Sequence, residues 1–337
     1  MTLSVGLIGY GRIGAMHADL LSRLVDGAEL AVVYEPVAER ARQAAVDLGV
    51  RTVEEEAAVF ESGIDAVAIC SSTPTHPRYV KMAAQAGIAA FCEKPISLDL
   101  DEAASAVESA ESAGIPLIIG FNRRLDSAHR AVREGIARGE IGDPWQVLII
   151  SRDPQPPPPE YLPVSGGLFR DMTIHDFDMA RYLLGEEVVE VHVTATSLVI
   201  PEAAELGDVD TAFISLRYRS GALGLIVNCR AAAYGYEQRI EVNGSHGQLS
   251  SVDPPLRHTR LATAAGFSTP ALHHFFIERY QESYLQQWRE FLALVRGEES
   301  AAATGRDGFK ALALAEAAQQ SHDTGSPVTR IRGISAG

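Results

Sequence analysis

The stretch from Leu3 to Glu35 constrains the fold more than any other part of the chain. A short apolar strand, Val5–Ile8, runs directly into the glycine-rich segment GYGRIG at residues 9–14, and a helical pattern follows. A second strand, Leu30–Tyr34, ends at the acidic Glu35, about 20 residues after the last glycine. A strand, a glycine-rich turn, a helix and a second strand ending in an acid are the full sequence context of a dinucleotide-binding unit.

Each glycine of this segment has a separate physical reason. Gly9 permits the tight turn, Gly11 lets the backbone approach a pyrophosphate, and Gly14 lets the helix pack close to the strand. The N–H groups at the start of the helix attract phosphate oxygens. Glu35 can accept hydrogen bonds from both adenosine ribose hydroxyls and would repel a 2′-phosphate, which favours NAD over NADP. The alternative is a tight strand–helix turn that binds no ligand.

Length and composition bound the class of protein. A chain of 337 residues is too long for one ordinary core, so we expect two domains. Its net charge of −15 argues against a nucleic-acid or anionic-membrane partner. No apolar run is as long as a membrane span, and the first strand begins almost at Met1, which predicts a cytoplasmic protein without a signal peptide.

The three cysteines are far apart and lack the spacing of metal ligands. Cys70 and Cys92 lie in apolar, strand-like runs, so we interpret them as buried free thiols. The histidines outside the candidate sites also show no ligand arrangement. We therefore expect no metal.

Strands and helices alternate as far as Gly120. Apolar strands at 64–70, 88–92 and 117–120 predict a doubly wound parallel sheet. The polar loops at 71–77, 93–95 and 121–126 follow these strands, and ligands of such sheets bind beyond the carboxyl ends of the strands. A dinucleotide-binding Rossmann domain over residues 1–121 is the prediction.

The pattern changes in the remainder of the chain. The proline-rich segment 154–163 is expected to be irregular, either a rigid surface connection or a lid, and a helix is expected at 171–184. Five strands then follow at short intervals: 189–198, 210–218, 222–230, 238–243 and 248–251. Two helices, 279–296 and 308–324, close the chain. We therefore expect an α+β substrate-binding and oligomerisation domain at 122–337, with a large, mostly antiparallel sheet open on one face, and an α/β protein overall.

Lys94 is the first candidate for chemistry. It stands at the tip of an inner parallel strand, next to Pro95, where a nicotinamide should lie. A lysine there can hydrogen-bond a substrate hydroxyl and stabilise the developing alkoxide or carbonyl. The alternative is a solvated lysine that pairs with Glu93.

Asp171 and His175 are the second candidates. They are four residues apart at the start of the predicted helix, so they would share a face that continues through the apolar Met179 and Leu183. A carboxylate beside an imidazole orients the ring and stabilises its charged form, which suits a general base. The alternative is Asp171 as a helix N-cap and His175 as a satisfied core histidine.

Further polar groups are expected at the same rim. Arg123 and Arg124, with Asp126 nearby, follow the last parallel strand and could bind substrate or cofactor, or form interdomain salt bridges instead. Asp153 and the tyrosines Tyr234 and Tyr236 are weaker candidates for the same cleft.

The segments GLIGYGRIG, STPTH, EKP, GFNRR and a D-x-x-x-H helix occur in the order seen in the Gfo/Idh/MocA oxidoreductases, and the chain resembles that family over its full length. Its longer segments, such as SRDPQPPPPEY and YGYEQRIEVNGSHG, are similar to those of the bacterial inositol dehydrogenases, a branch of that family. The resemblance implies catalytic roles for Lys94, Asp171 and His175.

The resemblance also assigns binding residues. The implied cofactor contacts come from the glycine-rich turn with Arg12 and Ile13, from Glu35, from the loop after the 64–70 strand, and from the EKP motif: Gly9, Gly11, Arg12, Ile13, Gly14, Glu35, Ser71, Thr73, Pro74, His76, Glu93 and Lys94. The implied polyol contacts are Lys94, Arg123, Asp153, Thr173, His175 and Tyr236. It further implies that the open sheet face is an oligomer interface, usually of a homotetramer.

The function that follows is NAD-dependent oxidation of a secondary hydroxyl of a cyclic polyol, with myo-inositol as the first expectation. One alternative is a dehydrogenase of the same family acting on another sugar or polyol, such as glucose, scyllo-inositol or an inositol methyl ether. The other is a non-catalytic NAD-binding sensor. A sensor would be expected to lose the lysine or the Asp–His pair, and this chain has all three residues.

Overall fold

The computed structural model describes residues 2–334, which divide into two units that each contain a six-stranded sheet. The first unit comprises residues up to 125 together with 282–309. The second comprises residues 126–281 and 310 onward. This division differs from the one expected at 121, because a segment near the C-terminus belongs to the first unit.

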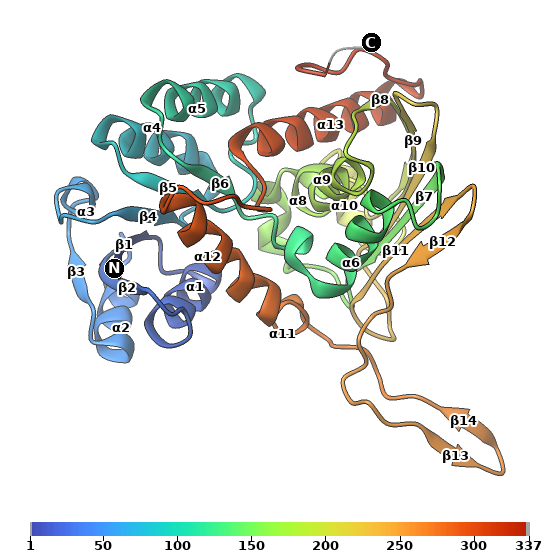
Figure 1. Ribbon diagram of the computed structural model, residues 1–337, viewed down its shortest axis with the longest axis horizontal. Coiled ribbons are helices and arrows are strands. Elements are labelled where there is room, and N and C mark those ends of the chain that lie inside the picture. Colours follow the sequence, from blue (N-terminus) through green and yellow to red (C-terminus); the bar gives the residue numbers. More distant parts are fainter. Residues whose placement is uncertain (1, 335–337) are drawn as a thin grey trace. The chain divides into compact units, whose positions relative to one another are not determined.

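The sheet of the first unit is parallel throughout, with the strand order β3-β2-β1-β4-β5-β6. Every residue of β4 and β5 is buried, as the continuous apolar runs predicted. Figure 1 shows α4 and α5 on one side of this sheet and α1 and α2 on the other. The strands are β1 (Leu3–Ile8), β2 (Ala28–Tyr34), β3 (Arg51–Val53), β4 (Ala66–Ile69), β5 (Ala89–Cys92) and β6 (Leu117–Ile119). The helices are α1 (Arg12–Arg23), α2 (Ala38–Leu48), α3 (Ala57–Phe60), η1 (Thr73–Thr75), α4 (His76–Ala86), α5 (Leu100–Ala113), η2 (Asn122–Leu125) and α12 (Gln281–Val295).

Helix α12 completes the core of the first unit. The indole of Trp288 stacks on the ring of Phe91 in β5, with centroids 4.7 Å apart and an interplanar angle of 16°. The backbone N–H of Ile119 donates to the carbonyl of Ala303 at 2.8 Å, which adds the returning chain beside β6. Cys70 and Cys92 are buried free thiols as expected, and burial raises the pKa of both well above the usual range.

The sheet of the second unit is mixed, in the order β12-β11-β7-β10-β9-β8. Neighbouring strands are antiparallel except β7 and β10, which run parallel. Buried and exposed residues alternate along β9, so one face is covered and the other is open. Its strands are β7 (Pro144–Arg152), β8 (Val188–Thr196), β9 (Thr211–Tyr218), β10 (Leu223–Cys229), β11 (Glu237–Gly244) and β12 (Gly247–Ser250). Its helices are α6 (Ser127–Ala137), η3 (Pro159–Tyr161), α7 (Leu162–Ser165), α8 (Gly167–Asp171), α9 (Thr173–Leu184), α10 (Pro201–Glu205), α11 (Phe276–Arg279) and α13 (Gly305–Thr324), the last beginning in the first unit.

Two segments of the second unit differ from expectation. The proline-rich segment is not wholly irregular, because η3 and α7 form within and after it, each with proline in its first turn, where a missing N–H costs nothing. The helix expected at 171–184 is two helices, α8 and α9, separated at Met172.

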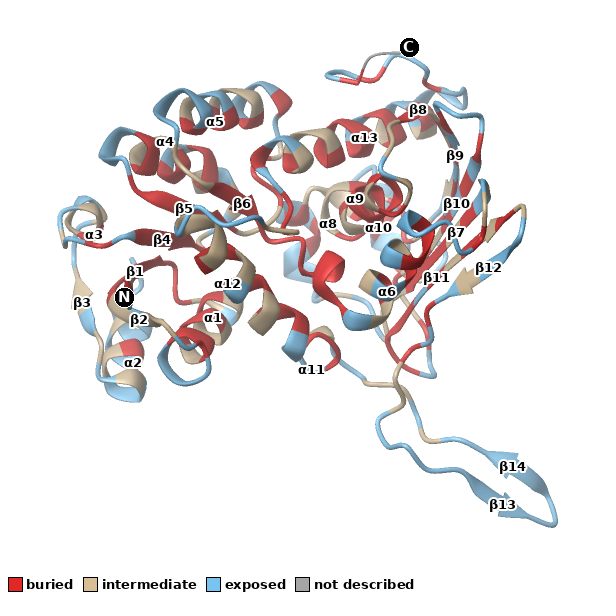
Figure 2. Cartoon of the chain, viewed as in Figure 1, coloured by how far each residue is buried: buried red, intermediate tan, exposed pale blue. Residues whose placement is uncertain are grey.

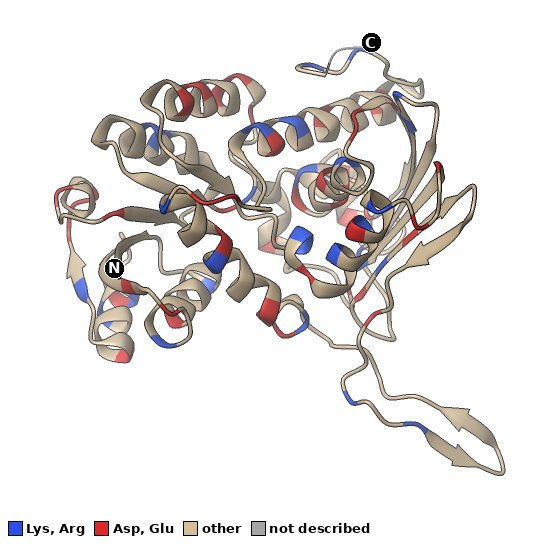
Figure 3. Ribbon diagram, viewed as in Figure 1, with Lys and Arg blue, Asp and Glu red and all other residues tan. Residues whose placement is uncertain are grey.

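A hairpin of β13 (Leu261–Thr263) and β14 (Gly266–Ser268) was not expected from the sequence. It extends away from the sheet of its unit, and all residues of both strands are exposed (Figures 1 and 2). Neither strand carries a charged residue (Figure 3). The strands are only three residues long, too short to show a period of two in the sequence.

Residues 2–334 contain neither a membrane-spanning helix nor a cluster of metal-binding side chains. No helix in this range is long and apolar enough to cross a membrane. The same range contains no group of three or more His, Cys, Asp or Glu side chains that could hold a metal ion.

Candidate active site

The glycine-rich turn has the geometry that the sequence predicted. Gly9 has φ of 95°, and a Cβ there would lie 2.7 Å from the carbonyl oxygen of Cys70. A Cβ at Gly14 would lie 2.0 Å from the carbonyl oxygen of Gly9, so only glycine allows α1 to pack this close to the turn. A Cβ at Gly11 would meet nothing within 4 Å. The space beside Gly11 is therefore open to a ligand.

The start of α1 and the Glu35 carboxylate complete a cradle that fits a dinucleotide. The N-cap of helix α1 is Gly11, without a side-chain cap hydrogen bond, and the first turn has no acid, so its N–H groups can donate to phosphate oxygens. Arg12 is exposed and Ile13 half-buried at this end. The carboxylate of Glu35 accepts from the backbone N–H of Tyr10 at 2.6 Å and from that of Val37 at 3.0 Å. Glu35 thus fastens the glycine turn to the end of β2 and keeps lone pairs for ribose hydroxyls.

The loop after β4 is fastened to the loop after β5 by His76. One ring nitrogen of His76 lies 3.0 Å from the carbonyl oxygen of Ser71, and the other lies 2.8 Å from that of Pro95. Its side chain is fully buried, and this burial lowers the pKa of the imidazole although the two backbone bonds oppose the shift. The expected contact of this side chain with the cofactor is therefore corrected to a supporting role. Ser71 and Thr73 are half-buried and Pro74 is exposed, so these three remain candidates.

Glu93 and Lys94 are half-buried at the end of β5. The Glu93 carboxylate accepts from the backbone N–H of Lys94 at 3.1 Å and lies 2.9 Å from Nε2 of His17 in α1. The peptide bond between Lys94 and Pro95 is cis. The lysine that the sequence singled out therefore sits on a backbone fixed by its neighbour's side chain.

The two arginines after β6, Arg123 and Arg124, differ in their contacts. The guanidinium of Arg124 forms an ion pair with Asp307 at 3.2 Å, and both residues belong to the first unit. Asp126 caps α6 and pairs with Arg279 at 2.6 Å, both within the second unit. These ion pairs of Arg124 and Asp126 thus each join residues of one unit. Arg123 is buried in η2 and remains the binding candidate.

Asp171 and His175 do not share one continuous helix, so the four-residue spacing argument for a common face is wrong. Asp171 is the last residue of α8, and His175 lies in the first turn of α9, where its N–H donates to the carbonyl of Met172 at 3.3 Å. The N-cap of α9 is Met172, so Asp171 does not cap this helix, and His175 is half-buried.

The Asp171 carboxylate is held by two residues that the sequence did not single out. Its Oδ1 accepts from the hydroxyl of Tyr161 at 2.9 Å, and its Oδ2 accepts from Nη1 of Arg230 at 3.2 Å. The Arg230 side chain is almost fully buried, so its charge acts on Asp171 with little screening. Tyr161 comes from the proline-rich segment, which is thereby tied to the candidate catalytic carboxylate.

Thr173 is a correction, because its side chain is fully buried and has no surface for a polyol. Its hydroxyl donates to Oδ1 of Asn228 at 2.5 Å, and Asn228 donates to the buried carboxylate of Asp176 at 2.8 Å. Ser151 donates to the other oxygen of Asp176 at 2.6 Å. This network joins α9 to β7 and β10, and so fixes the direction of the helix that carries His175.

The remaining candidates lie at one end of the second sheet. Asp153 follows β7 and is half-buried, with its backbone N–H donating to the carbonyl of Cys229 at 3.0 Å. Tyr236 is buried with its ring edge-to-face on Tyr280, at a centroid distance of 6.0 Å. Tyr234 accepts from Arg152 at 2.9 Å and donates to Glu237, which makes it part of a surface ion network.

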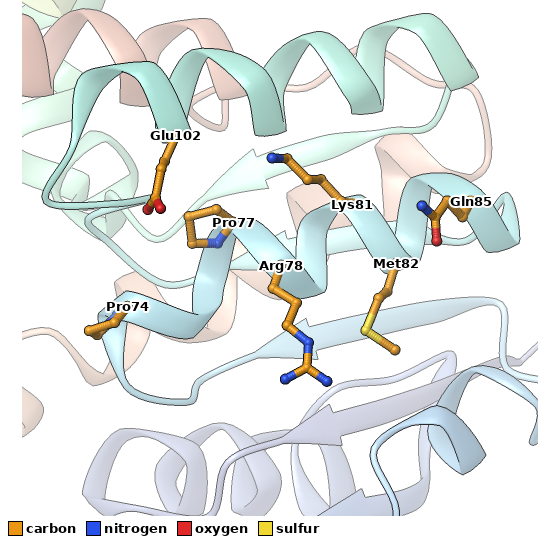
Figure 4. Close-up of a pocket in the computed structure, with 7 residues that line it drawn as sticks. All are labelled: Pro74, Pro77, Arg78, Lys81, Met82, Gln85 and Glu102. Atoms are coloured by element: carbon orange, nitrogen blue, oxygen red, sulfur yellow. The ribbon is translucent and has the colours of Figure 1, made fainter.

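A separate hollow of about 350 Å³ lies on the first unit. Its lining comes from α4, the turn before it and the first turn of α5: Pro74, Pro77, Arg78, Lys81, Met82, Gln85 and Glu102 (Figure 4). Arg78 is already paired with Glu56. Only Pro74 belongs to the predicted set, so this hollow is not the candidate site.

Comparison with known proteins agrees with these features. Residues 3–121 match the model of an oxidoreductase family with an NAD-binding Rossmann fold, and residues 129–250 match the GFO/IDH/MocA C-terminal domain. The myo-inositol 2-dehydrogenase of Thermotoga maritima is 43% identical over 95% of this chain and 96% of its own length. The chain belongs to the Gfo/Idh/MocA family of oxidoreductases. Its N-terminal Rossmann domain, its second domain with a mixed sheet and its NAD cofactor are those of the family, as the sequence predicted.

Other members of the Gfo/Idh/MocA family bear on the substrate. The inositol 2-dehydrogenase of Rhizobium meliloti is 44% identical over 95% of this chain and 97% of its own length. A solved structure of myo-inositol dehydrogenase from Lactobacillus casei contains NAD(H) and myo-inositol, and it matches with a TM-score of 0.89 at 27% identity over 99% of both chains.

Proposed function

We propose that this protein is an NAD-dependent dehydrogenase that oxidises a secondary hydroxyl of a cyclic polyol, and that it converts myo-inositol to 2-keto-myo-inositol. The observation that carries the proposal is the identity of 43–44%, over 95% of the chain, to two proteins named as inositol 2-dehydrogenases. The glycine turn, Glu35, Lys94 and the pair Asp171 and His175 supply the residue types that this reaction needs.

NAD is held, in this proposal, by the cradle around Gly11, the start of α1, Glu35 and the exposed parts of the loops after β4 and β5. When bound, its nicotinamide supplies the acceptor for the hydride that leaves the substrate carbon. The negative charge of Glu35 disfavours the 2′-phosphate of NADP. The fully buried His76 supports these loops from beneath.

His175 takes the proton of the reacting hydroxyl as general base. Asp171 orients the imidazole and stabilises its charged form, while Arg230 and Tyr161 fix the Asp171 carboxylate through the bonds described above. Tyr161 donates to Oδ1 and Arg230 to Oδ2, and because each carboxylate oxygen can accept more than one hydrogen bond, the carboxylate can also bind the imidazole ring.

Lys94 binds the same hydroxyl oxygen and stabilises the negative charge that develops on it as the proton leaves. Arg123, Asp153 and Tyr236 bind the other hydroxyls of the ring and so select which carbon reacts. Thr173 contributes indirectly, through the buried network beneath α9.

We further propose a cytoplasmic homotetramer assembled through the open face of the second sheet. This face carries Phe213, Leu223 and Leu225, each of which is more than one-third exposed. Pairing places Phe213 opposite Val227 and Leu225 opposite Leu148, so the apolar side chains continue across three neighbouring strands. A contiguous apolar area of this kind is typical of an interface with another protein surface.

The proposal is tested by NADH formation with purified protein, NAD or NADP, and a panel of inositols and aldoses at mildly alkaline pH. We expect the highest kcat/KM with myo-inositol and NAD. Turnover of a different polyol would reassign the substrate within the family. NADH binding without turnover of any polyol would favour the sensor, and equal use of NADP would refute the role given to Glu35.

A further inference from the structure

A chain of hydrogen bonds inside the first unit ends at the backbone of Lys94. The indole Nε1 of Trp288 in α12 donates to Nδ1 of His17 in α1 at 3.0 Å. Nε2 of His17 lies 2.9 Å from Oε1 of Glu93. The other carboxylate oxygen, Oε2, accepts from the N–H of Lys94 at 3.1 Å. Three segments far apart in the sequence thus meet next to the proposed catalytic lysine.

The order of donors fixes the protonation state of the imidazole. An indole N–H can only donate, so Nδ1 of His17 must be the acceptor and carries no proton. The ring proton therefore sits on Nε2, from which it is donated to Glu93. His17 is thus held as one neutral tautomer, and the negative charge of Glu93 is retained beside Lys94.

The side chains of His17 and Trp288 are buried and closely packed. His17 and Trp288 are 0% exposed, so neither can touch a ligand, and Trp288 stacks on Phe91 of β5, the strand that Glu93 follows. A Cβ at Gly120 would lie 2.7 Å from Oε2 of Glu93, so a glycine makes the room for the carboxylate. Burying an imidazole–carboxylate pair in an apolar core costs free energy of desolvation. A well-packed pair of apolar side chains would usually stabilise the fold as well.

We propose that His17 and Trp288 are positioning residues for Lys94. They hold the Glu93 carboxylate in one orientation, and Glu93 holds the backbone from which the lysine side chain extends. The inference deepens the proposed function, on which it rests, because it assumes that Lys94 binds the reacting oxygen. Nothing in it requires His17 or Trp288 to contact cofactor or substrate.

The kinetic test compares two replacements of His17. In His17→Asn the amide reaches the place of Nδ1 and can still accept from Trp288, but it falls short of Glu93. His17→Gln is one methylene longer and brings an N–H donor to about the place of Nε2. We expect His17→Asn to lower kcat about 10- to 100-fold, because small displacements of a reacting group have effects of this size. We expect His17→Gln to keep most of the kcat of the unmodified protein.

Control measurements distinguish a loss of Lys94 positioning from a general loss of folding. His192→Asn, at a half-buried histidine on β8 of the second unit, is expected to leave kcat unchanged. Both His17 variants should remain folded with similar melting temperatures, and the NADH dissociation constant of His17→Asn should stay close to that of the unmodified protein. Equal loss of kcat in both His17 variants, or no loss in His17→Asn, would overturn the inference.

A second measurement does not depend on turnover. The chain contains only three lysines, Lys81, Lys94 and Lys310. Reductive methylation with ¹³C-formaldehyde therefore gives a simple NMR spectrum, in which Lys94→Arg identifies the Lys94 signal. We expect that signal to move in His17→Asn and to return in His17→Gln.

The two measurements distinguish the inference from the function it rests on. An unmoved Lys94 signal in His17→Asn refutes the positioning role whatever the enzyme does. A moved signal in a protein that oxidises no polyol supports the positioning role and refutes the proposed function instead.

Discussion

Among single residues, Lys94 is the one on which the proposed reaction depends first. We expect Lys94→Ala to lower kcat by about 10²- to 10³-fold, the usual cost of removing a group that stabilises a developing oxyanion. NADH binding, measured by fluorescence titration, should be retained. The matched control is Lys81→Ala, at the half-buried lysine of α4 outside the candidate site. Undiminished turnover in Lys94→Ala would remove the lysine from the mechanism.

Residues with a local sequence signal were the predictable part of the site. The roles of Gly9, Gly11 and Gly14 follow from one short motif, and the structure has the close approaches that the motif implies. The roles of His17 and Arg230 could not be predicted from a local motif, because neither residue belongs to one. Their partners, Trp288 and Asp171, are distant in the sequence. Thr173 was misassigned because burial of a short polar side chain in a helix depends on what packs over it.

At the scale of elements, the β1–α1 turn offers a matched pair of substitutions. Gly14→Ala places a Cβ against the carbonyl of Gly9, and we expect a loss of about 1–3 kcal/mol in the free energy of unfolding together with weaker NAD binding. Gly11→Ala meets no protein atom within 4 Å, so its stability should be unchanged while the added methyl weakens NAD binding. Denaturant unfolding and NADH titration check both.

Equal destabilisation by the two substitutions would contradict the assignment of packing to Gly14 and ligand approach to Gly11. So would full NAD affinity in Gly11→Ala.

The end of α9 is joined to α13 through Glu187. Burial works to raise the pKa of this carboxyl, but hydrogen bonds from Arg181 and Lys310 outweigh it and lower the pKa from 4.5 to about 2. Because the folded-state pKa lies below the unfolded value, the stabilisation is present above pH 4.5 and is lost as the pH falls towards 2. The difference corresponds to about 3 kcal/mol at neutral pH, as an order of magnitude.

Urea unfolding of the unmodified protein and Glu187→Gln at pH 7 and pH 3.5 tests this pairing. We expect the difference in unfolding free energy between the two proteins to shrink by roughly 1 kcal/mol at the lower pH. A difference that does not depend on pH would contradict the assignment of the low pKa to Glu187.

The break between α8 and α9 shows what sequence periodicity leaves open. The run from Asp171 to Leu184 contains neither glycine nor proline, so nothing local predicts an interruption at Met172. The interruption is set by tertiary contacts, since Asp171 is held by Arg230 of the sheet and Thr173 by Asn228. The chemistry assigned to Asp171 and His175 stays a proposal, and the argument that they share one continuous helix is wrong.

At the scale of the whole molecule, the alternation of strands and helices was enough to predict a Rossmann domain and a second domain. The return of residues 282–309 to the first unit was not predictable, because an amphipathic helix such as α12 does not encode which surface it covers. The parallel pairing of β7 with β10 also depends on contacts between segments far apart in the sequence.

The apolar open face of the second sheet predicts that the protein forms a homotetramer. We expect light scattering to give a mass four times the 36.2 kDa of the chain. Phe213→Asp places a charge on the apolar open face and should shift the protein to smaller species, whereas Val46→Asp, at an exposed valine of α2, should not. A monomeric unmodified protein, or an unchanged mass in Phe213→Asp, would contradict the proposed interface.

The proposed hydride transfer from carbon 2 of myo-inositol to NAD is tested most directly with a deuterium label. The protein is incubated with NAD and myo-inositol deuterated at carbon 2, and the nicotinamide and the sugar product are examined by mass spectrometry and NMR. We expect deuterium at C4 of the reduced nicotinamide, a ketone at carbon 2 and a slower rate than with unlabelled substrate. Unlabelled NADH, a ketone at another carbon or no reduction of NAD would contradict the account.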